Sequence, residues 1–263
     1  MTESRSTQED LMGKPGKAAL FGAVGAVALT AVLAPPASAI IGGHDATAEY
    51  PFMVSVQKDG HHYCGATLIE PDWIVTAGHC TVDVKPEQLS VRIGDHDRTK
   101  GAEAKVTEVI AHPDFSYEPF HDDVAVMKLD HPVDAQPVEI AAEPGPAGTG
   151  TRILGWGMTC EDGSECPDPP ITLQELDTEL VPDDRCTENY APGNELCTDS
   201  PTENAQACIL DSGGPQLAGR PGDWQLIGAT SRDGDADPTC ATGPGIYTDL
   251  TAHRDWIERT TAR

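Results

Sequence analysis

Three short segments of this 263-residue chain carry the residue types that acyl transfer to a protein hydroxyl requires. Such chemistry needs a nucleophile, a base beside it and a group that orients the base. Ser212 lies in the glycine-rich segment 211–215, whose sharp turn would present the hydroxyl and aim backbone N–H groups at a developing oxyanion. His79 lies among small residues before Cys80, and Asp123 directly precedes an apolar run. The sequence therefore predicts a nucleophile, a base and a carboxylate for one site.

Short β-type runs separated by turn residues fill most of the chain after residue 40. Each run is bounded by Gly, Pro, Asp or Asn, which are the residues that form turns. No helical period separates the runs, so the pattern indicates an all-β barrel or sandwich. The predicted strands are 52–56, 67–69, 73–75, 89–93, 124–129, 152–156 and 224–229.

Only two segments favour a helix. Residues 251–259 place apolar side chains on roughly one face, and Thr251 is positioned to cap them. Pro182 is a good first residue for a short helix through residue 185. The stretch 142–150, rich in Pro, Gly and acidic residues, lies near the middle of the chain and could link two β subdomains.

The first 39 residues have the pattern of an export signal. Lys14 and Lys17 precede an apolar stretch over 18–33, and Ala37-Ser38-Ala39 matches a signal-peptidase site. The stretch is short for a membrane span and prolines follow it, although an uncleaved anchor helix is the alternative. We therefore expect residues 1–39 to be a signal peptide and 40–263 to be a secreted domain with no membrane attachment.

The composition excludes several classes of partner. Lys and Arg total 17 against 43 Asp and Glu, which gives a formal net charge of −26. No basic footprint for nucleic acid or an anionic membrane is present, whereas the negative charge favours solubility and could steer cationic substrates. Eight cysteines argue against an intrinsically disordered acidic chain.

All eight cysteines lie in the exported part, where four disulfides are the default. Cys160 and Cys166 flank a short loop and are expected to pair with each other. The residues alone leave the other connections open, and no Cys-x-x-Cys cluster suggests a zinc site. Of the nine histidines, the eight other than His79 are expected at the surface.

The motifs resemble those of the trypsin- and chymotrypsin-like serine endopeptidases, and the resemblance covers nearly all of residues 40–259. The order His, Asp, Ser along the chain is the order in that family. The resemblance implies two six-stranded antiparallel β-barrels packed together, with a short C-terminal helix. The matching segments are 40–43, 76–80, 123–129, 155–157, 211–215 and 244–248.

The resemblance also implies a role for each residue of the expected triad. Ser212 would be the nucleophile, His79 the general acid and base, and Asp123 the carboxylate that orients the imidazole. Ser231 stands where the family has a serine bonded to that aspartate. Asp122 is the nearest rival to Asp123, but the family motif places the carboxylate directly before the apolar run.

Three disulfides follow from the resemblance rather than from the residues themselves. With the local Cys160–Cys166 pair they would use all eight cysteines in structural roles. The implied pairs are Cys64–Cys80, Cys186–Cys197 and Cys208–Cys240.

Activation in the resembled family depends on a new N-terminus whose ammonium group pairs with the aspartate before the nucleophile. Here that aspartate is Asp211, and signal cleavage after Ala39 would expose Ile40 directly. No basic activation site precedes Ile40. The hypothesis is that export and activation are one event, and the alternative is that an exopeptidase trims a short remnant.

Two departures from the family pattern bear on activity. Leu210 replaces a glycine whose N–H, together with that of Ser212, would form the oxyanion hole. A Cβ restricts the backbone there, which puts catalytic efficiency in question more than reaction class. At the floor of the substrate pocket Gln206 replaces the aspartate of trypsins, so a buried substrate cation would find no charged partner there.

The sequence therefore predicts cleavage after neutral side chains. Arg232 stands where the family usually has an aromatic residue, and it either binds substrate carboxylates or points to solvent. The residues assigned to the pocket are Gln206, Ala207, Ser231, Arg232, Asp233 and Gly245.

Asp95 and Glu103 flank a loop that binds calcium in some relatives, but the loop is short and a hard cation needs about six oxygens. A solvated acidic turn is expected instead, with no metal and no cofactor. The overall prediction is a monomeric secreted serine endopeptidase that acts on proteins or peptides and could meet proteinaceous inhibitors. The alternative is a protease-like binding protein with weak or no catalytic activity.

Overall fold

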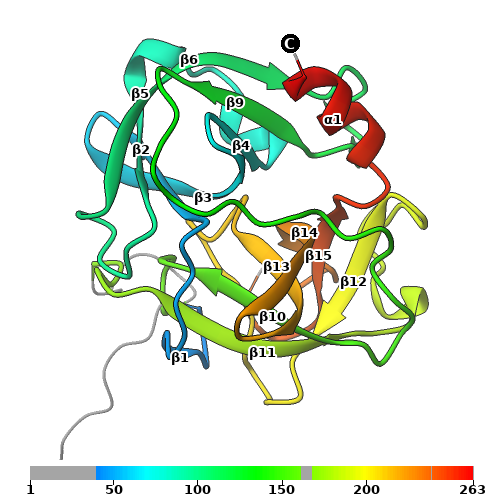
Figure 1. Cartoon of the computed structure of the whole chain (residues 1–263). Helices are drawn as coiled ribbons and strands as arrows, with labels where there is room; N and C mark the ends of the chain where they lie inside the picture. Colours follow the sequence, from blue (N-terminus) through cyan, green and yellow to red (C-terminus); the bar gives the residue numbers. More distant parts are fainter. Residues whose placement is uncertain (1–39, 161–167, 238, 263) are drawn as a thin grey trace, which may run out of the picture. The chain divides into compact units, whose positions relative to one another are not determined.

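The computed structural model describes residues 40–160, 168–237 and 239–262 (Figure 1). The expected signal peptide over 1–39 lies outside the described residues, and so does Cys166. No helix within the described ranges is long and apolar enough to cross a membrane.

The first half of the described chain forms a closed antiparallel barrel with the strand order β2-β3-β4-β9-β6-β5. Side chains alternate along its strands, so that one set points into an apolar core. In β5, for example, Leu89, Val91 and Ile93 are buried and the residues between them are half-buried. The strands are β2 (Met53–Lys58), β3 (His61–Glu70), β4 (Trp73–Thr76), β5 (Leu89–Ile93), β6 (Ala102–Ala111) and β9 (Ala125–Leu129).

The second half forms another ring of six antiparallel strands in the order β11-β10-β13-β14-β15-β12. Pairing of β11 with β12 closes the ring, and β1 (His44–Asp45) adds to the outer edge of β11. The six strands are β10 (Gly150–Gly155), β11 (Gln174–Leu180), β12 (Glu195–Asp199), β13 (Pro215–Arg220), β14 (Asp223–Asp233) and β15 (Gly245–Asp249).

Residues 130–149 connect the barrels and run across the front of the molecule as the long green segment of Figure 1. Three short 3-10 helices are η1 (Gly78–Thr81), η2 (Pro86–Gln88) and η3 (Asp183–Arg185), the last at the place predicted from Pro182. A small hairpin of β7 (Ser116–Tyr117) and β8 (Phe120–His121) precedes β9.

The C-terminal helix α1 (Arg254–Thr261) begins later than predicted. Its N-cap is His253 rather than Thr251, and no side chain caps it. Thr251 instead donates its hydroxyl to Asp249 Oδ1 at 2.6 Å, because the turn before the helix offers this carboxylate as a closer acceptor. The expected fold of two six-stranded barrels and one short C-terminal helix is confirmed.

Three disulfides connect the described residues in the pairing that the family resemblance implied. They join Cys64 to Cys80, Cys186 to Cys197, and Cys208 to Cys240. The first fixes η1 to β3, and the third ties the segment before Ser212 to the loop before β15. The expected Cys160–Cys166 pair stays a prediction because Cys166 lies outside the described residues.

Candidate active site

His79 and Asp123 meet where η1 of the first barrel approaches the start of β9. Asp123 is fully buried, and its Oδ2 lies 2.9 Å from His79 Nδ1. The backbone N–H of His79 donates to Asp123 Oδ1 at 2.8 Å, so one carboxylate binds both the main chain and the ring of the histidine. A carboxylate at Nδ1 fixes the tautomer with the proton on Nδ1 and leaves Nε2 free to accept a proton.

Two hydroxyl groups of the second barrel donate hydrogen bonds to Asp123. Ser231, near the end of β14, donates its Oγ–H to Asp123 Oδ2 at 2.7 Å. Thr248 of β15 donates to the Asp123 carbonyl at 2.8 Å. The rival residue Asp122 does not bind His79: its Oδ1 lies 3.0 Å from His253 Nε2. The geometry therefore places Asp123, and not Asp122, against the imidazole.

Ser212 lies in a tight turn between the disulfide at Cys208 and the start of β13. Gly213 has a φ of 76°, and a Cβ there would collide with Thr76 Oγ1 and the Gly65 carbonyl. The turn needs glycine both for its left-handed backbone and for its close approach to the first barrel. The N–H of Gly65 donates to the Ser212 carbonyl at 2.8 Å, which joins the turn to β3 across the interface between the barrels.

The serine and the histidine are neighbours without a formed hydrogen bond. The Ser212 carbonyl lies 3.8 Å from the sulfur of Cys80, the residue after His79. No hydrogen bond joins the Ser212 hydroxyl to His79 among the described residues. Catalytic hydrogen bonds are often long in ligand-free enzymes and tighten when substrate binds, so the lack of this hydrogen bond does not argue against proton transfer between the two residues.

Leu210 adopts a φ of 76°, a region that favours glycine. Its carbonyl lies 3.2 Å from His62 Nε2, while Ser55 Oγ lies 2.8 Å from Nδ1 of the same ring. Within the described chain, the N–H groups of Leu210 and Ser212 have no hydrogen-bond acceptor in the protein. Two free N–H groups beside the nucleophile are the donors that an oxyanion hole requires.

Asp211 is buried behind this turn with 1% of its surface exposed. Its two carboxylate oxygens accept hydrogen bonds from the N–H groups of Gly157 at 2.7 Å and Cys208 at 3.0 Å. Burial raises the pKa of Asp211 to about 7, although both N–H groups act in the opposite direction. Ile40 is completely buried in the core of the second barrel, and no contact joins it to the Asp211 carboxylate among the described residues.

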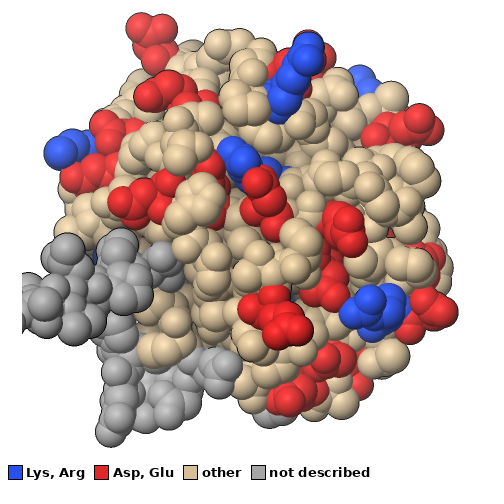
Figure 2. All heavy atoms as spheres, turned by 90° about the horizontal axis from the view of Figure 1, so that it is seen from below, with Lys and Arg blue, Asp and Glu red and all other residues tan. Residues whose placement is uncertain are grey.

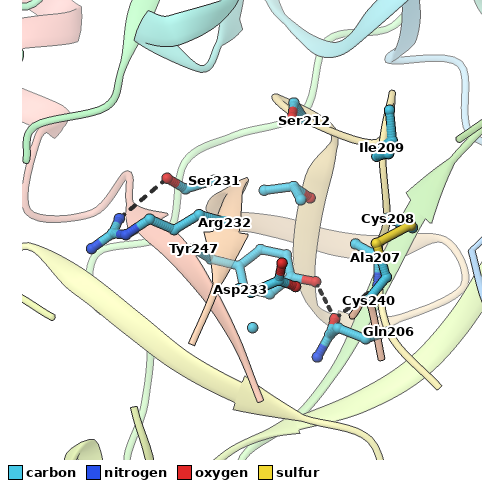
Figure 3. A pocket seen from close by; sticks show the side chains of 12 residues that line it. Gln206, Ala207, Cys208, Ile209, Ser212, Ser231, Arg232, Asp233, Cys240 and Tyr247 are labelled. Carbon is cyan, nitrogen blue, oxygen red and sulfur yellow. Dashed lines mark hydrogen bonds between the residues drawn. A yellow bond between two sulfur atoms is a disulfide. The ribbon is translucent and has the colours of Figure 1, made fainter. Parts of the chain in front are cut away.

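A pocket of about 170 Å³ opens beside Ser212 (Figure 3). All six residues that the sequence assigned to the substrate pocket line it, together with Tyr247 and Thr230 among others. Gln206 forms the floor, and its amide is fully engaged: Oε1 accepts from the Tyr247 hydroxyl at 2.6 Å and from the Ala207 N–H at 3.0 Å. Its Nε2 donates to the Thr198 carbonyl at 3.2 Å.

The Arg232 guanidinium does not point to solvent. It donates to both carboxylate oxygens of Glu195, at 2.7 and 3.0 Å, and lies 5.0 Å above the Phe120 ring. Only 16% of the Arg232 side chain is exposed, and Glu195 is almost completely buried. The expectation of a solvent-facing guanidinium is therefore wrong, because a buried carboxylate on β12 needs a cation nearby.

Sequence reasoning missed several residues around the site. His62 and His253 are 8% and 5% exposed, so the expectation that they are surface residues is wrong. Both rings are buried because each bonds two polar partners. Nothing in the sequence marks Glu195 as the partner of Arg232, since the two residues meet only when β12 and β14 flank β15.

The loop considered for calcium uses its acids within the protein. Asp95 Oδ1 accepts the Asp97 N–H at 2.8 Å, and Glu103 pairs with Arg92 at 3.0 Å. More widely, acidic side chains spread over the face seen in Figure 2, where Lys and Arg are fewer. The full chain has a formal net charge of −26, which attracts cations to the protein.

Sequence comparisons place these features among known proteins. A sequence model of the family described as Trypsin matches residues 40–257. The chain is 36% identical over 228 residues to a trypsin from Saccharopolyspora erythraea, which covers 82% of this chain and 95% of that protein. It is 35% identical over 231 residues to trypsin theta from Drosophila melanogaster, with 83% and 84% covered. Serine protease 56 from Homo sapiens is 34% identical over 236 residues, 83% of this chain but 38% of that longer protein.

Proposed function

The chain belongs to the trypsin family of serine endopeptidases, and on that premise we propose that Ser212, His79 and Asp123 hydrolyse peptide bonds through an acyl-enzyme. The observation that carries the proposal is the buried Asp123 carboxylate 2.9 Å from His79 Nδ1. This contact holds the imidazole with Nε2 free to take a proton, which is the state that a general base for serine requires.

In the proposed reaction, Ser212 Oγ attacks the substrate carbonyl while its proton passes to His79 Nε2. The carbonyl oxygen becomes an oxyanion that accepts hydrogen bonds from the Leu210 and Ser212 N–H groups. His79 then protonates the leaving amine as the C–N bond breaks, which leaves the acyl group on Ser212. Water attacks this ester, gives its proton to His79, and the acid product departs as Ser212 recovers its proton.

The proposed activation requires a free amino group at Ile40. Ile41 and Gln206 exchange two backbone hydrogen bonds of 3.0 Å, which fixes this terminus beside the pocket floor. An ammonium at Ile40 would offer the buried Asp211 carboxylate the cation that it lacks among the described residues. Export and activation then coincide, and the test is N-terminal sequencing of protein recovered from the medium. A start at any residue other than Ile40 contradicts this step.

The floor of the pocket supports cleavage after neutral side chains. Gln206 is uncharged and all its polar atoms already have partners, so it gives no compensation for burying a substrate cation. Apolar and medium-sized side chains would contact this floor without leaving a polar group unpaired.

A binding protein without catalysis is the second candidate. It is favoured by one observation, the φ of 76° at Leu210, because a strained non-glycine residue could displace an oxyanion donor. Labelling separates the two functions. A neutral sulfonyl fluoride added to protein that begins at Ile40 should form a covalent adduct on Ser212, detected by mass spectrometry. Ser212→Ala should abolish both the adduct and peptide hydrolysis, whereas absence of an adduct on the unmodified enzyme contradicts the proposed reaction.

A further inference from the structure

His253 is a buried histidine whose two ring nitrogens both face hydrogen-bond acceptors. Its Nδ1 lies 2.7 Å from the Asp249 carbonyl, and its Nε2 lies 3.0 Å from Asp122 Oδ1. The side chain is only 4% exposed, so water offers neither nitrogen an alternative partner. A carbonyl and an ionised carboxylate accept hydrogen bonds and donate none. With Asp122 ionised, both contacts are therefore satisfied only by the doubly protonated, positively charged imidazole.

The charges around His253 favour this form. Asp249, whose carbonyl His253 bonds, directs its own carboxylate to N–H groups of the following turn. Arg254, the first residue of α1, pairs with Glu258 at 2.7 Å. Within the described ranges, no lysine or arginine forms an ion pair with Asp122 or Asp249. His253 is thus the basic group that these two carboxylates share.

His112 packs against His253 and does not compete with it for a proton. The two rings meet edge to face, with centroids 5.2 Å apart, and Trp256 lies 4.8 Å from His112 on α1. His112 Nδ1 accepts the Asp114 N–H at 3.3 Å, so this nitrogen carries no proton. Burial is the main cause that lowers the pKa of His112, and the charge of His253 adds to the effect.

Asp122 connects this contact to the triad because it is the residue before Asp123. Its φ is 51°, a left-handed conformation that a non-glycine residue keeps only where its contacts hold it. Its carbonyl accepts the Val124 N–H at 2.8 Å, so the chain turns tightly around Asp123. Asn194 Nδ2 adds a long hydrogen bond of 3.4 Å to the same Oδ1 that His253 bonds. The direction of the Asp123 side chain thus depends on a turn that the Asp122 side chain anchors.

Two adjacent aspartates therefore bind two histidines with different capacities. Asp123 bonds His79 at Nδ1 and leaves Nε2 free to exchange a proton. Asp122 bonds His253 at Nε2, and the second nitrogen of that ring is also engaged. The first pair can transfer protons, whereas the second has no free nitrogen and can only hold its partners in place.

We propose that His253 is a positively charged positioning residue, which acts through Asp122 to hold Asp123 against His79. The proposal rests on the proposed peptidase function and adds to it a residue pair outside the triad. In this role His253 orients the catalytic carboxylate and takes no proton from the substrate. Loss of its charge would leave the Asp122 carboxylate without a cation and would free the turn before Asp123.

NMR spectroscopy measures the charge of His253 directly. Nitrogen spectra of protein with isotope-labelled histidines separate the doubly protonated ring from both neutral tautomers, because each nitrogen reports whether it carries a proton. The sample is Ser212→Ala protein beginning at Ile40, which cannot digest itself. At the pH of maximal activity it should contain a doubly protonated ring whose signals disappear in His253→Gln.

Kinetics with the enzyme beginning at Ile40 test the positioning role. His253→Gln should lower kcat by about 10-fold or more and change KM by less than about 2-fold, because a displaced catalytic group slows the chemistry without weakening substrate binding. Asp122→Asn should lower kcat by only about 2- to 5-fold, since its amide can still donate to a neutral His253. In the Asp122→Asn background, His253→Gln should cost less than it does alone, because no buried carboxylate is left unpaired.

His131→Gln is the matched control. It removes a histidine whose Nδ1 lies 2.8 Å from Asp130 Oδ1 at the surface, so it should leave kcat unchanged. The proton that His79 Nδ1 shares with Asp123 provides a readout that a merely structural role would not move. Its NMR resonance should shift in His253→Gln and keep its position in His131→Gln.

A neutral His253 ring at the pH of maximal activity overturns the proposal, and so does an unchanged kcat in folded His253→Gln. An equal loss from His253→Gln with and without the Asp122 carboxylate also overturns it. Where His253→Gln fails to fold, the kcat of Asp122→Asn and the NMR measurement on the His253 protein still decide. Failure of the enzyme to label on Ser212 or to hydrolyse any peptide overturns the peptidase function itself, whatever the charge of His253, so the two failures are distinguishable.

Discussion

The two halves of the candidate site are held in place by different means. On one side, the His79–Asp123 pair is fixed by four hydrogen bonds: two from His79 to the Asp123 carboxylate and one each from Ser231 and Thr248. On the other side, the turn that carries Ser212 contains a leucine at a φ of 76° and covers a buried carboxylate, Asp211, that has no cation among the described residues.

This contrast suggests a division of the site: folding alone forms the His79–Asp123 half, whereas the Ser212 half requires cleavage of the chain. The histidine side is complete in the intact chain, since all its partners are internal side chains and backbone groups. The Asp122–His253 contact of 3.0 Å further anchors the segment before Asp123 to the N-cap residue of α1. In the activation that we propose, the serine side depends on a charge at Ile40 that only chain cleavage can create. On that proposal, the half of the site that moves protons is preformed, and the half that stabilises the oxyanion is conditional on cleavage.

The largest expected effect comes from the preformed half. Asp123→Asn should lower kcat by about 10⁴-fold, because an amide at this position favours the wrong tautomer of His79. Assays of hydrolysis of a peptide with Leu before the scissile bond measure the loss of kcat. Far-UV circular dichroism and the presence of the three disulfides show whether the variant still folds. Asp122→Asn is the matched control one residue away, and a loss of similar size there would contradict the assignment of Asp123.

The conditional half predicts a pH dependence of stability for the uncleaved form. A chain that begins at Ser38 has no ammonium at Ile40, so its Asp211 keeps a pKa of about 7 when folded, well above the ordinary pKa of 3.8 for an aspartate. A raised pKa means that the folded state binds the proton more tightly. The stabilisation is therefore complete below pH 3.8 and is lost as the pH rises through about 7, by about 4 kcal/mol in total.

Urea unfolding at pH 4.5 and 8, in a Ser212→Ala background that prevents autolysis, measures this difference. The same chain beginning at Ile40 is the control, because its new ammonium should lower the pKa of Asp211 and remove most of the loss. Other titrating groups are shared by both chains and cancel in the comparison. Equal pH dependence of the two chains would show that Ile40 does not reach Asp211.

Activity should separate the same two chains by a smaller factor. The chain beginning at Ser38 should have a kcat at least about 10²-fold lower than the chain beginning at Ile40, the usual effect of losing one oxyanion donor. Its pair of His79 and Asp123 is unchanged, so the loss reports on the turn at Ser212 alone. Equal kcat values would mean that the serine turn, like the His79–Asp123 pair, is formed without an ammonium at Ile40.

Much of the architecture was predictable because many strands of this protein have a strand pattern within a short window of sequence. All seven predicted strands overlap observed ones, and β5 alternates buried and half-buried side chains as the pattern requires. Among the missed strands, β11 has a largely polar pattern. Of the seven residues of β11, Gln174–Leu180, three are acidic, and Glu175 is completely buried because Arg152 and Tyr50 bond it. Such burial depends on partners more than 20 residues away, which no local window contains.

The site divides in the same way. His79, Asp123 and Ser212 lie in recognisable motifs, and the pocket residues were placed by resemblance. The partners that decide the chemistry of the pocket were not predictable, since Arg232 finds Glu195 from β12 and Asp233 lies opposite Gly245 of β15. These are cross-strand relations set by a register shift in β14, which depends on the tertiary structure.

The smallest predicted effect concerns the leucine in the conditional half. Leu210→Gly removes the Cβ that opposes a φ of 76°, so it should raise the free energy of unfolding by about 1 kcal/mol and kcat by about 2- to 10-fold. Leu210→Ala is the control, because it shortens the side chain but keeps the Cβ and should improve neither quantity. An equal gain in both variants would mean that the side chain obstructs substrate. No gain in either would mean that the contacts of the half-buried leucine offset its strained backbone, and that the serine turn is conditional only on the charge at Ile40.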